Sequence, residues 1–273
     1  MDFERFDGFW RRLAKDQLGL PEALPVGALL AKALETWTGC IVCNLLRLRA
    51  FDVIARWQAA LVSDLAERRD FLRCETWCNR HGWLVIELSS PRDLGRLHRQ
   101  LLLAPKARME DLLRRDLGRL RGHSPQAILA CLVGERVCPL CQDEAALLRD
   151  LLDDLVQGLA TGTLRATFAQ SEGCCLPHLA ALLAQVPDGD TARFLLEATQ
   201  NVLYRLAADL DRYEEETQSH RRDYGSAADA PGRAMRVWAG RRGTASDLSA
   251  SPPPAAPGEG GRPVSSARVQ RGE

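Results

Sequence analysis

The sequence predicts an all-α body of two tandem, pseudo-symmetric helical repeats, each with a Cys-x-x-Cys and a Cys-x-x-His motif, followed by a disordered tail. Three observations lead to this prediction. Apolar residues recur at three- and four-residue spacing along most of the chain, as on one face of an α-helix. Alternating strand patterns are scarce, and only residues 83–88 come close to one. The two cysteine motifs occur twice in the same order.

The helical pattern is divided into segments by residues that break helices. Residues 1–26 are expected to form a helical extension, and the longest later runs cover residues 45–59, 147–159 and 191–224. Between the runs stand clusters of proline, glycine, serine and threonine, which favour turns. These breaks lie at residues 21–25, 89–91, 105, 122–125, 161–163 and 187–189.

The cysteine motifs indicate that one unit of roughly a hundred residues occurs twice. The Cys-x-x-Cys motifs are 98 residues apart, and the Cys-x-x-His motifs are 97 residues apart. This agreement assigns residues 27–123 to repeat 1 and residues 124–224 to repeat 2. The eight candidate metal ligands are Cys40, Cys43, Cys78, His81, Cys138, Cys141, Cys175 and His178.

The chemistry of these side chains favours a metal site in each repeat. Two cysteines in a Cys-x-x-Cys turn can bind one ion, and a Cys and a His three residues apart lie on one face of a helix. Three sulfurs and one imidazole complete a closed structural zinc site, so we expect two Zn2+ ions. A 4Fe–4S cluster on the same ligands is the alternative. We expect each site to close within its own repeat; the other arrangement exchanges the Cys-x-x-His motifs between the repeats.

Three further cysteines break the symmetry between the repeats. Free cysteine packs as a small apolar side chain, so we interpret them as small buried hydrophobes. Additional ligands or redox partners are the other interpretation. They are Cys74, Cys131 and Cys174, and the matching positions of the other repeat hold Ser171, Ala33 and Trp77.

Residues 225–273 differ in composition from the rest and are expected to form a disordered Gly/Pro/Arg tail. This segment holds eight glycines and six prolines, and its large apolar residues are few and scattered. Such a segment cannot bury enough apolar surface to offset its loss of conformational entropy. Its seven arginines and four acidic residues make it slightly basic, whereas residues 1–224 carry a net charge of −3.

Charge and targeting patterns limit the classes of partner. The net charge of zero argues against a general polyanion binder, so nucleic-acid contact is expected only through the basic tail, if at all. The sequence shows no run of 18 apolar residues and no secretory signal. We therefore expect a cytoplasmic protein without a membrane span, in a compartment where thiols bind metals more often than they form disulfides.

Around these motifs the chain resembles a family of uncharacterised bacterial helical proteins, catalogued as a domain of unknown function, with duplicated CPxC and GxCxxH motifs. The second repeat matches in residues 138–141 (CPLC) and 173–178 (GCCLPH). The first repeat departs from the pattern, because no proline stands inside residues 40–43 and Thr76 stands where the pattern has glycine. The resemblance covers about residues 27–224 and implies metal binding in a duplicated helical fold, without an assigned reaction.

These observations favour a non-enzymatic metal-binding helical protein, an interaction or scaffold module with an unidentified protein partner. An iron–sulfur redox or sensor protein that uses the same ligands is the alternative. We assign no catalytic residue, because the chain lacks the nucleophile-elbow, phosphate-loop and zinc-protease motifs.

Overall fold

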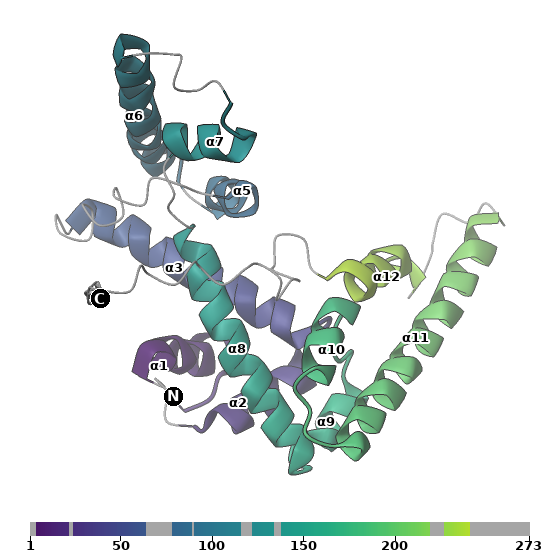
Figure 1. The fold of residues 1–273 in the computed structure, drawn as a ribbon. Helices are drawn as coiled ribbons and strands as arrows, with labels where there is room; N and C mark the ends of the chain where they lie inside the picture. The colour runs from purple at the N-terminus through teal and green to yellow at the C-terminus, as the bar shows by residue number, and fades with distance from the viewer. Residues whose placement is uncertain are drawn as a thin grey trace, which may run out of the picture.

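The computed structural model consists of helices joined by loops, and it confirms the all-α class (Figure 1). It describes residues 4–21, 24–63, 78–88, 90–115, 122–133, 138–218 and 227–240. No β-strand occurs within these ranges, and residues 83–88, the best strand candidate of the sequence, belong to a helix.

Three of the helices (α6, α7 and α8) begin at a proline, whose missing N–H costs nothing at a first helical position. In the first part of the chain they are α1 (Glu4–Arg12), a π-helical turn (Leu13–Gln17), α2 (Val26–Thr36), α3 (Ile41–Ser63), α5 (Asn79–Leu88), α6 (Pro91–Arg115) and α7 (Pro125–Val133). In the second part they are α8 (Pro139–Ala160), α9 (Arg165–Gln170), α10 (Leu176–Leu183), α11 (Gly189–Gln218) and α12 (Ala230–Ala239).

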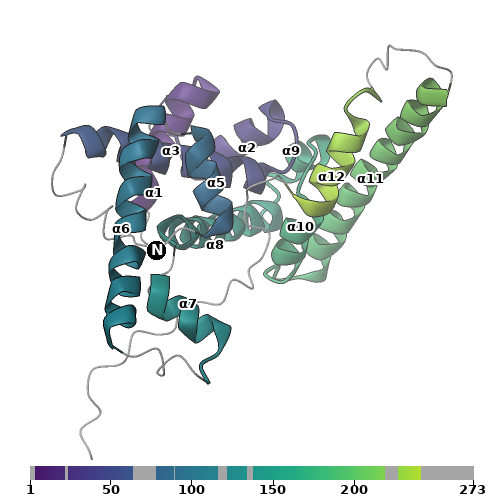
Figure 2. The same cartoon turned by 90° about the horizontal axis from the view of Figure 1, so that it is seen from above.

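The two long helices α3 and α8 form the centre of the molecule, where they cross and run in opposite senses (Figures 1 and 2). A buried ion pair joins them, because Arg49 of α3 donates two hydrogen bonds to Asp143 of α8, at 2.7 and 2.8 Å. The start of α3 lies beside α10 and the start of α8 lies beside α5. Each Cys-x-x-Cys motif therefore lies at a different end of this helix pair.

The apolar core is divided into two clusters along the α3–α8 pair. The larger one packs α1, α2, the first half of α3 and most of α8 against α9, α10 and α11. Its centre is a row of fully buried leucines on α8, from Leu147 to Leu159, at helical spacing. The smaller cluster joins the second half of α3 to α5 and to the start of α8. Cysteines of the predicted metal motifs belong to both clusters.

Helix α6 continues through Pro105, which the sequence predicted to be a break. A proline inside a helix removes one backbone hydrogen bond, yet it keeps φ close to the helical value. Helix α6 packs against α7 at one edge of the molecule.

The segment expected to be disordered from residue 225 contains helix α12, which corrects that prediction for residues 227–240. This helix packs against α10 and α11, with Ala227 and Ala230 buried, and Arg233 pairs with Asp209 of α11 at 2.8 Å. The prediction of disorder used the composition of the whole segment, which is rich in glycine and proline. That composition gave no sign of a ten-residue helix that packs through small alanines. Residues 241–273 lie outside the described ranges.

No helix in the described ranges is by itself long and apolar enough to cross a membrane. Only α2 together with residues 41–59 of α3 reaches that length and composition, and these two helices are bent by 108° at their junction.

Candidate metal centres

All four predicted ligand pairs lie at the start of a helix. The first cysteine of each pair precedes helices α3, α5, α8 or α10, and its backbone carbonyl accepts the first helical hydrogen bond, at 2.8 to 3.2 Å. The second ligand stands three residues later, in the first turn. Helix N-termini carry exposed N–H groups and the positive end of the helix dipole, which favour thiolates. The four pairs are Cys40 with Cys43, Cys78 with His81, Cys138 with Cys141, and Cys175 with His178.

The structure brings the eight side chains together in two groups of four. Within each group all the potential ligand atoms lie within 4.8 Å of one another. We call the two groups site 1 and site 2. Site 1 consists of Cys40, Cys43, Cys175 and His178, and site 2 consists of Cys78, His81, Cys138 and Cys141.

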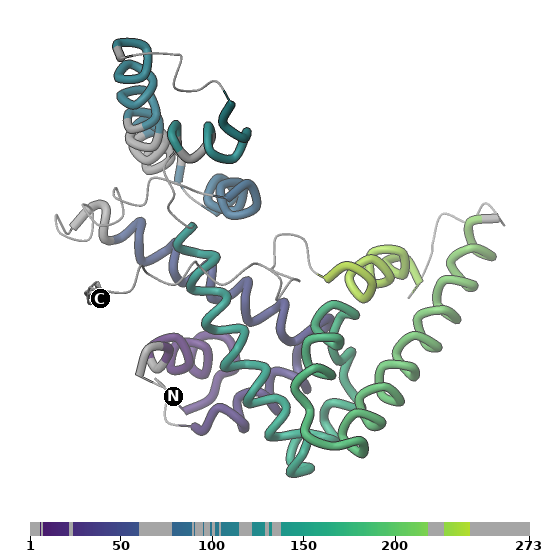
Figure 3. The backbone as a smooth tube through the Cα atoms, viewed as in Figure 1, coloured from purple at the N-terminus to yellow at the C-terminus, as the bar shows by residue number. Residues whose placement is uncertain are grey.

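This grouping corrects the expectation that each site closes within its own repeat. Each site combines the Cys-x-x-Cys pair of one predicted repeat with the Cys-x-x-His pair of the other. Helix α8 carries the chain away from site 2 over 22 residues from Pro139, a length of about 33 Å at about 1.5 Å per residue. The next residues form a turn and the short helix α9 at that far end instead of returning (Figure 3). The pair in α10 therefore meets the start of α3.

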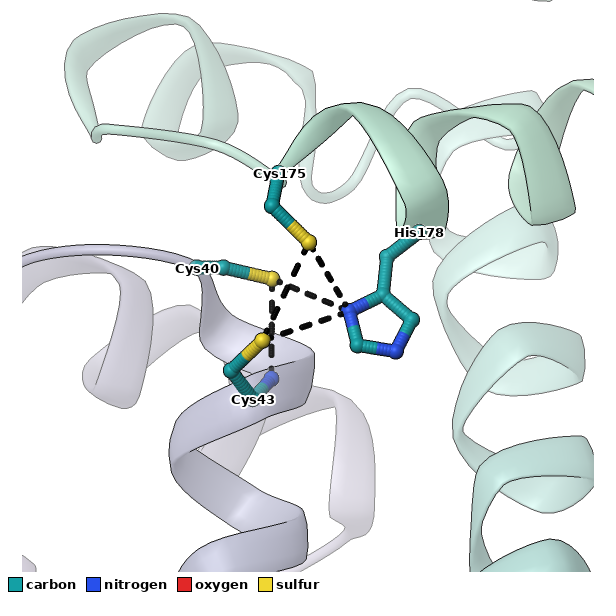
Figure 4. A group of neighbouring side chains, drawn as sticks. All are labelled: Cys40, Cys43, Cys175 and His178. Atoms are coloured by element: carbon teal, nitrogen blue, oxygen red, sulfur yellow. Dashed lines mark hydrogen bonds between the residues drawn. The ribbon is translucent and has the colours of Figure 1, made fainter. Parts of the chain in front are cut away.

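Site 1 is fully buried and arranged around the imidazole of His178 (Figure 4). Its Nδ1 atom lies 3.4 Å from the sulfurs of Cys40 and Cys43, and 3.2 Å from the sulfur of Cys175. The sulfurs of Cys43 and Cys175 are 3.8 Å apart. All four potential ligand atoms thus point toward one common centre between α3 and α10.

The loops around site 1 are also joined to each other. The backbone N–H of Gly39 donates to Oε2 of Glu172 at 2.8 Å, and the N–H of Ile41 donates to the carbonyl of Gly173 at 3.3 Å. Gly240, at the end of α12, covers the sulfurs: a Cβ placed on it would lie 3.4 Å from those of both Cys43 and Cys175. Its φ of +79° also favours glycine, so Gly240 approaches the sulfurs at a position suited to this residue.

Site 2 has the same arrangement around His81 but is partly open. Nδ1 of His81 lies 3.3 Å from the sulfurs of Cys78 and Cys141, and 3.4 Å from the sulfur of Cys138. The sulfurs of Cys78 and Cys141 are 3.5 Å apart. Cys138 and His81 are buried, whereas Cys78 and Cys141 are partly exposed. Site 2 is therefore the more accessible of the two.

The distances between these atoms fit a single tetrahedral ion. Bonds of about 2.3 Å to sulfur and about 2.0 Å to nitrogen, at tetrahedral angles, separate two sulfurs by about 3.8 Å and a sulfur from a nitrogen by about 3.5 Å. The observed separations, 3.5 and 3.8 Å between sulfurs and 3.2 to 3.4 Å from sulfur to nitrogen, lie close to these values. Both groups can therefore hold a metal ion.

The electrostatics of both sites are those of clustered thiols. Hydrogen bonds from neighbouring sulfurs, chiefly that of Cys175, hold the pKa of Cys43 well below its usual range, and Cys138 has the same effect on the pKa of Cys78. Burial raises the pKa of Cys40. Burial opposes a charged imidazole, yet contacts with cysteine sulfurs raise the pKa of His178 to about 10. In both sites the surrounding sulfurs thus lower the pKa of one thiol and raise the pKa of a neighbouring one, Cys175 in site 1 and Cys141 in site 2.

The three cysteines outside the pattern have different positions. Cys174 is buried beside Cys40, as predicted for a small apolar side chain, and it raises the pKa of that thiol. Cys131 is exposed on α7, so the prediction that it is buried was wrong. Cys74 lies outside the described residues. No sequence signal predicted that Cys174 lies near Cys40, because the two residues come together only through the exchange of motifs between the predicted repeats.

Comparisons of this chain with protein-family models, with curated proteins and with solved structures give no match. The functional argument therefore rests on the geometry of the two sites.

Proposed function

We propose that this protein is a non-enzymatic helical scaffold in which two structural zinc ions join the two halves of the chain. The exchange of motifs carries this proposal. In both sites a Cys-x-x-Cys pair and a Cys-x-x-His pair from distant parts of the chain come within 4.8 Å of one another. An ion held by both pairs fixes α3 to α10 and α5 to α8. When it is bound, zinc supplies folding free energy, because the unfolded chain has no preformed site.

A single zinc ion suits these side chains better than an iron–sulfur cluster does. The ligands of a 4Fe–4S cluster have to surround a cube of iron and sulfide, whereas the sulfurs described here approach to between 3.5 and 3.8 Å. Three thiolates and one imidazole form a tetrahedral set that zinc prefers in structural sites. Four protein ligands also leave no position for a water or a substrate, which supports a structural rather than a catalytic ion.

The proposed role as a scaffold includes an interaction with a protein partner, in the cytoplasm, as predicted from the sequence. The two half-sites of each ion lie on helices that also build the apolar core, so the ions make this core rigid. A rigid helical surface lowers the entropy cost of binding a partner.

Metal analysis of the purified full chain tests the proposal. We expect about two zinc ions per chain and no visible absorption. Cys43→Ser and Cys141→Ser should each lower the zinc content by about one ion and destabilise the fold, because each removes one of four ligands. Cys131→Ser is the matched control, since this cysteine is exposed and belongs to neither site.

Three results would contradict the proposal. A brown protein that contains iron and sulfide would make it an iron–sulfur protein instead. A colourless protein without bound metal would remove the basis for a metal scaffold. Variants that stay folded and keep both ions after the loss of a ligand would show that the grouped side chains do not hold them.

A further inference from the structure

At site 2 a carboxylate stands behind the imidazole. At site 2 the Nδ1 atom of His81 faces the three sulfurs, and Nε2 on the other edge of the ring lies 3.1 Å from Oε2 of Glu144. Both side chains are buried, at 0% and 1% exposed. A histidine that binds a metal through one nitrogen commonly donates its other N–H to a carboxylate, which fixes the tautomer and the orientation of the ring.

The carboxylate of Glu144 is held in this place by one further contact. Arg80, next to the ligand His81, donates to Oε2 of Glu144 at 2.6 Å. Among the described residues the other oxygen, Oε1, is buried without a hydrogen-bond partner, and Nε2 of His81 makes no regular hydrogen bond although it lies 3.1 Å from Oε2. Burying a carboxylate costs desolvation free energy unless its oxygens accept hydrogen bonds. A small rotation of the Glu144 side chain would let it accept the imidazole N–H of His81.

The position of α3 that corresponds to Glu144 holds an aliphatic side chain. Glu144 follows Cys141 by three residues on α8, one turn below the ligand. On α3 the residue three positions after Cys43 is Leu46, which is fully buried in the apolar core. The two helices therefore present an acidic and an aliphatic side chain at matching positions beneath otherwise similar sites.

We propose that Glu144 is a positioning residue that orients His81 for the metal ion of site 2, and that Arg80 holds Glu144 in place. The inference rests on the proposed metal binding and adds a difference between the two sites. Oriented by Glu144, the imidazole of His81 keeps Nδ1 directed at the sulfurs even though Cys78 and Cys141 are partly exposed. At site 1 all four potential ligands are buried.

Substitutions that remove the carboxylate test this role. Glu144→Leu introduces at site 2 the side chain that α3 carries at site 1, and Glu144→Gln keeps the shape but removes the charge. Loss of such a carboxylate lowers metal affinity by about 10- to 100-fold. We expect this loss at site 2 only, measured by zinc competition with a chelator of graded strength on the full chain. The imidazole 15N signals of His81 and His178 report the two sites separately.

A double variant separates positioning from ion pairing. Glu144→Leu leaves Arg80 without its buried partner, which by itself destabilises the protein. The double variant Glu144→Leu with Arg80→Met removes both charges and restores the balance. If Glu144 positions His81, zinc affinity at site 2 stays low in the double variant, and the Nε2 proton of His81 in the zinc-loaded protein loses the downfield shift of a carboxylate hydrogen bond.

The outcomes distinguish this inference from the proposed function. Recovery of wild-type affinity in the double variant would show that Glu144 only neutralises Arg80, and would overturn the positioning role. Unchanged affinity in all three variants, in a chain that binds two ions, would also overturn it while the scaffold proposal stands. A wild-type chain that binds no zinc would refute the scaffold proposal and this inference together.

Discussion

The ion pair between Arg49 and Asp143 offers the sharpest test of how α3 and α8 are held together. The side chain of Arg49 is 7% exposed and donates two hydrogen bonds to Asp143 and one to Asp52, at 3.1 Å. Its guanidinium also lies 5.0 Å from the ring centre of Phe6. Removing one partner of a buried pair costs about 3 to 5 kcal/mol, because the other charge stays buried.

We expect Asp143→Ala to lower the free energy of unfolding by about 3 kcal/mol, the lower end of this range, because Asp52 still pairs with Arg49. For a chain of this size each kcal/mol lowers Tm by about 2 to 4 °C, so the expected fall is about 6 to 12 °C. Thermal unfolding followed by circular dichroism with excess zinc measures it. Arg12→Ala is the control, because this arginine contacts Asp52 from an exposed position and should cost less than about 1 kcal/mol.

A second substitution shows whether the cost comes from the unpaired charge. Replacing both partners, Asp143→Ala together with Arg49→Met, should recover much of the lost stability, because an apolar pair needs no compensation. A fall of less than about 3 °C for Asp143→Ala, equal to about 1 kcal/mol, would refute this reasoning. So would a double variant that is less stable than the single one.

Three further predictions concern packing, ionisation and the cover of site 1. Gly158→Ala should destabilise the fold by about 1 to 3 kcal/mol, because its Cβ would lie 2.7 Å from Cγ of the buried Leu164. Gly27→Ala, in open space on α2, should stabilise it by up to about 1 kcal/mol, and chemical denaturation compares the two. Burial and two neighbouring aspartates raise the pKa of Asp154 to about 6, so its folded form prefers the proton and wild-type stability falls as pH rises from about 4 to 6. Asp154→Asn should remove this fall and gain on the order of 1 kcal/mol at pH 7 after solvent screening; equal pH profiles of Tm would contradict it. A chain ending at residue 226 should have a lower Tm and faster thiol labelling at site 1 in the zinc-free state than a chain ending at Gly240, and equal rates would show that α12 gives no cover.

The helical class and the four ligand pairs, each three residues apart, were accessible from the sequence, because both depend on local spacing. The leucine row of α8 recurs at helical spacing, and Cys-x-x-Cys places two sulfurs in one helical turn whatever the rest of the chain does. The break predicted at Pro105 failed because proline disfavours a helix interior without forbidding it.

The sequence did not predict which two motifs share a site, because this depends on the tertiary packing of the helices. The spacing from Cys141 to Cys175 is compatible with a returning hairpin or with a chain that continues, and only the packing of α9 and α10 against α2 and α8 decides. The role of Glu144 was hidden for the same reason. An acidic residue in the first turns of a helix is ordinary, and its burial against His81 follows from tertiary structure alone.

The exchange of motifs also nests one site within the other along the chain. Site 2 joins residues 78 and 141, and both lie between residues 40 and 178, which site 1 joins. Once site 2 has closed, the loop that site 1 must close is about half as long, which lowers its entropy cost by about 0.6 kcal/mol. During synthesis the inner ligands all leave the ribosome before His178 does. If both sites bind metal as proposed, we expect the chain to close from the inside outward, with the partly exposed site 2 loaded before the buried site 1.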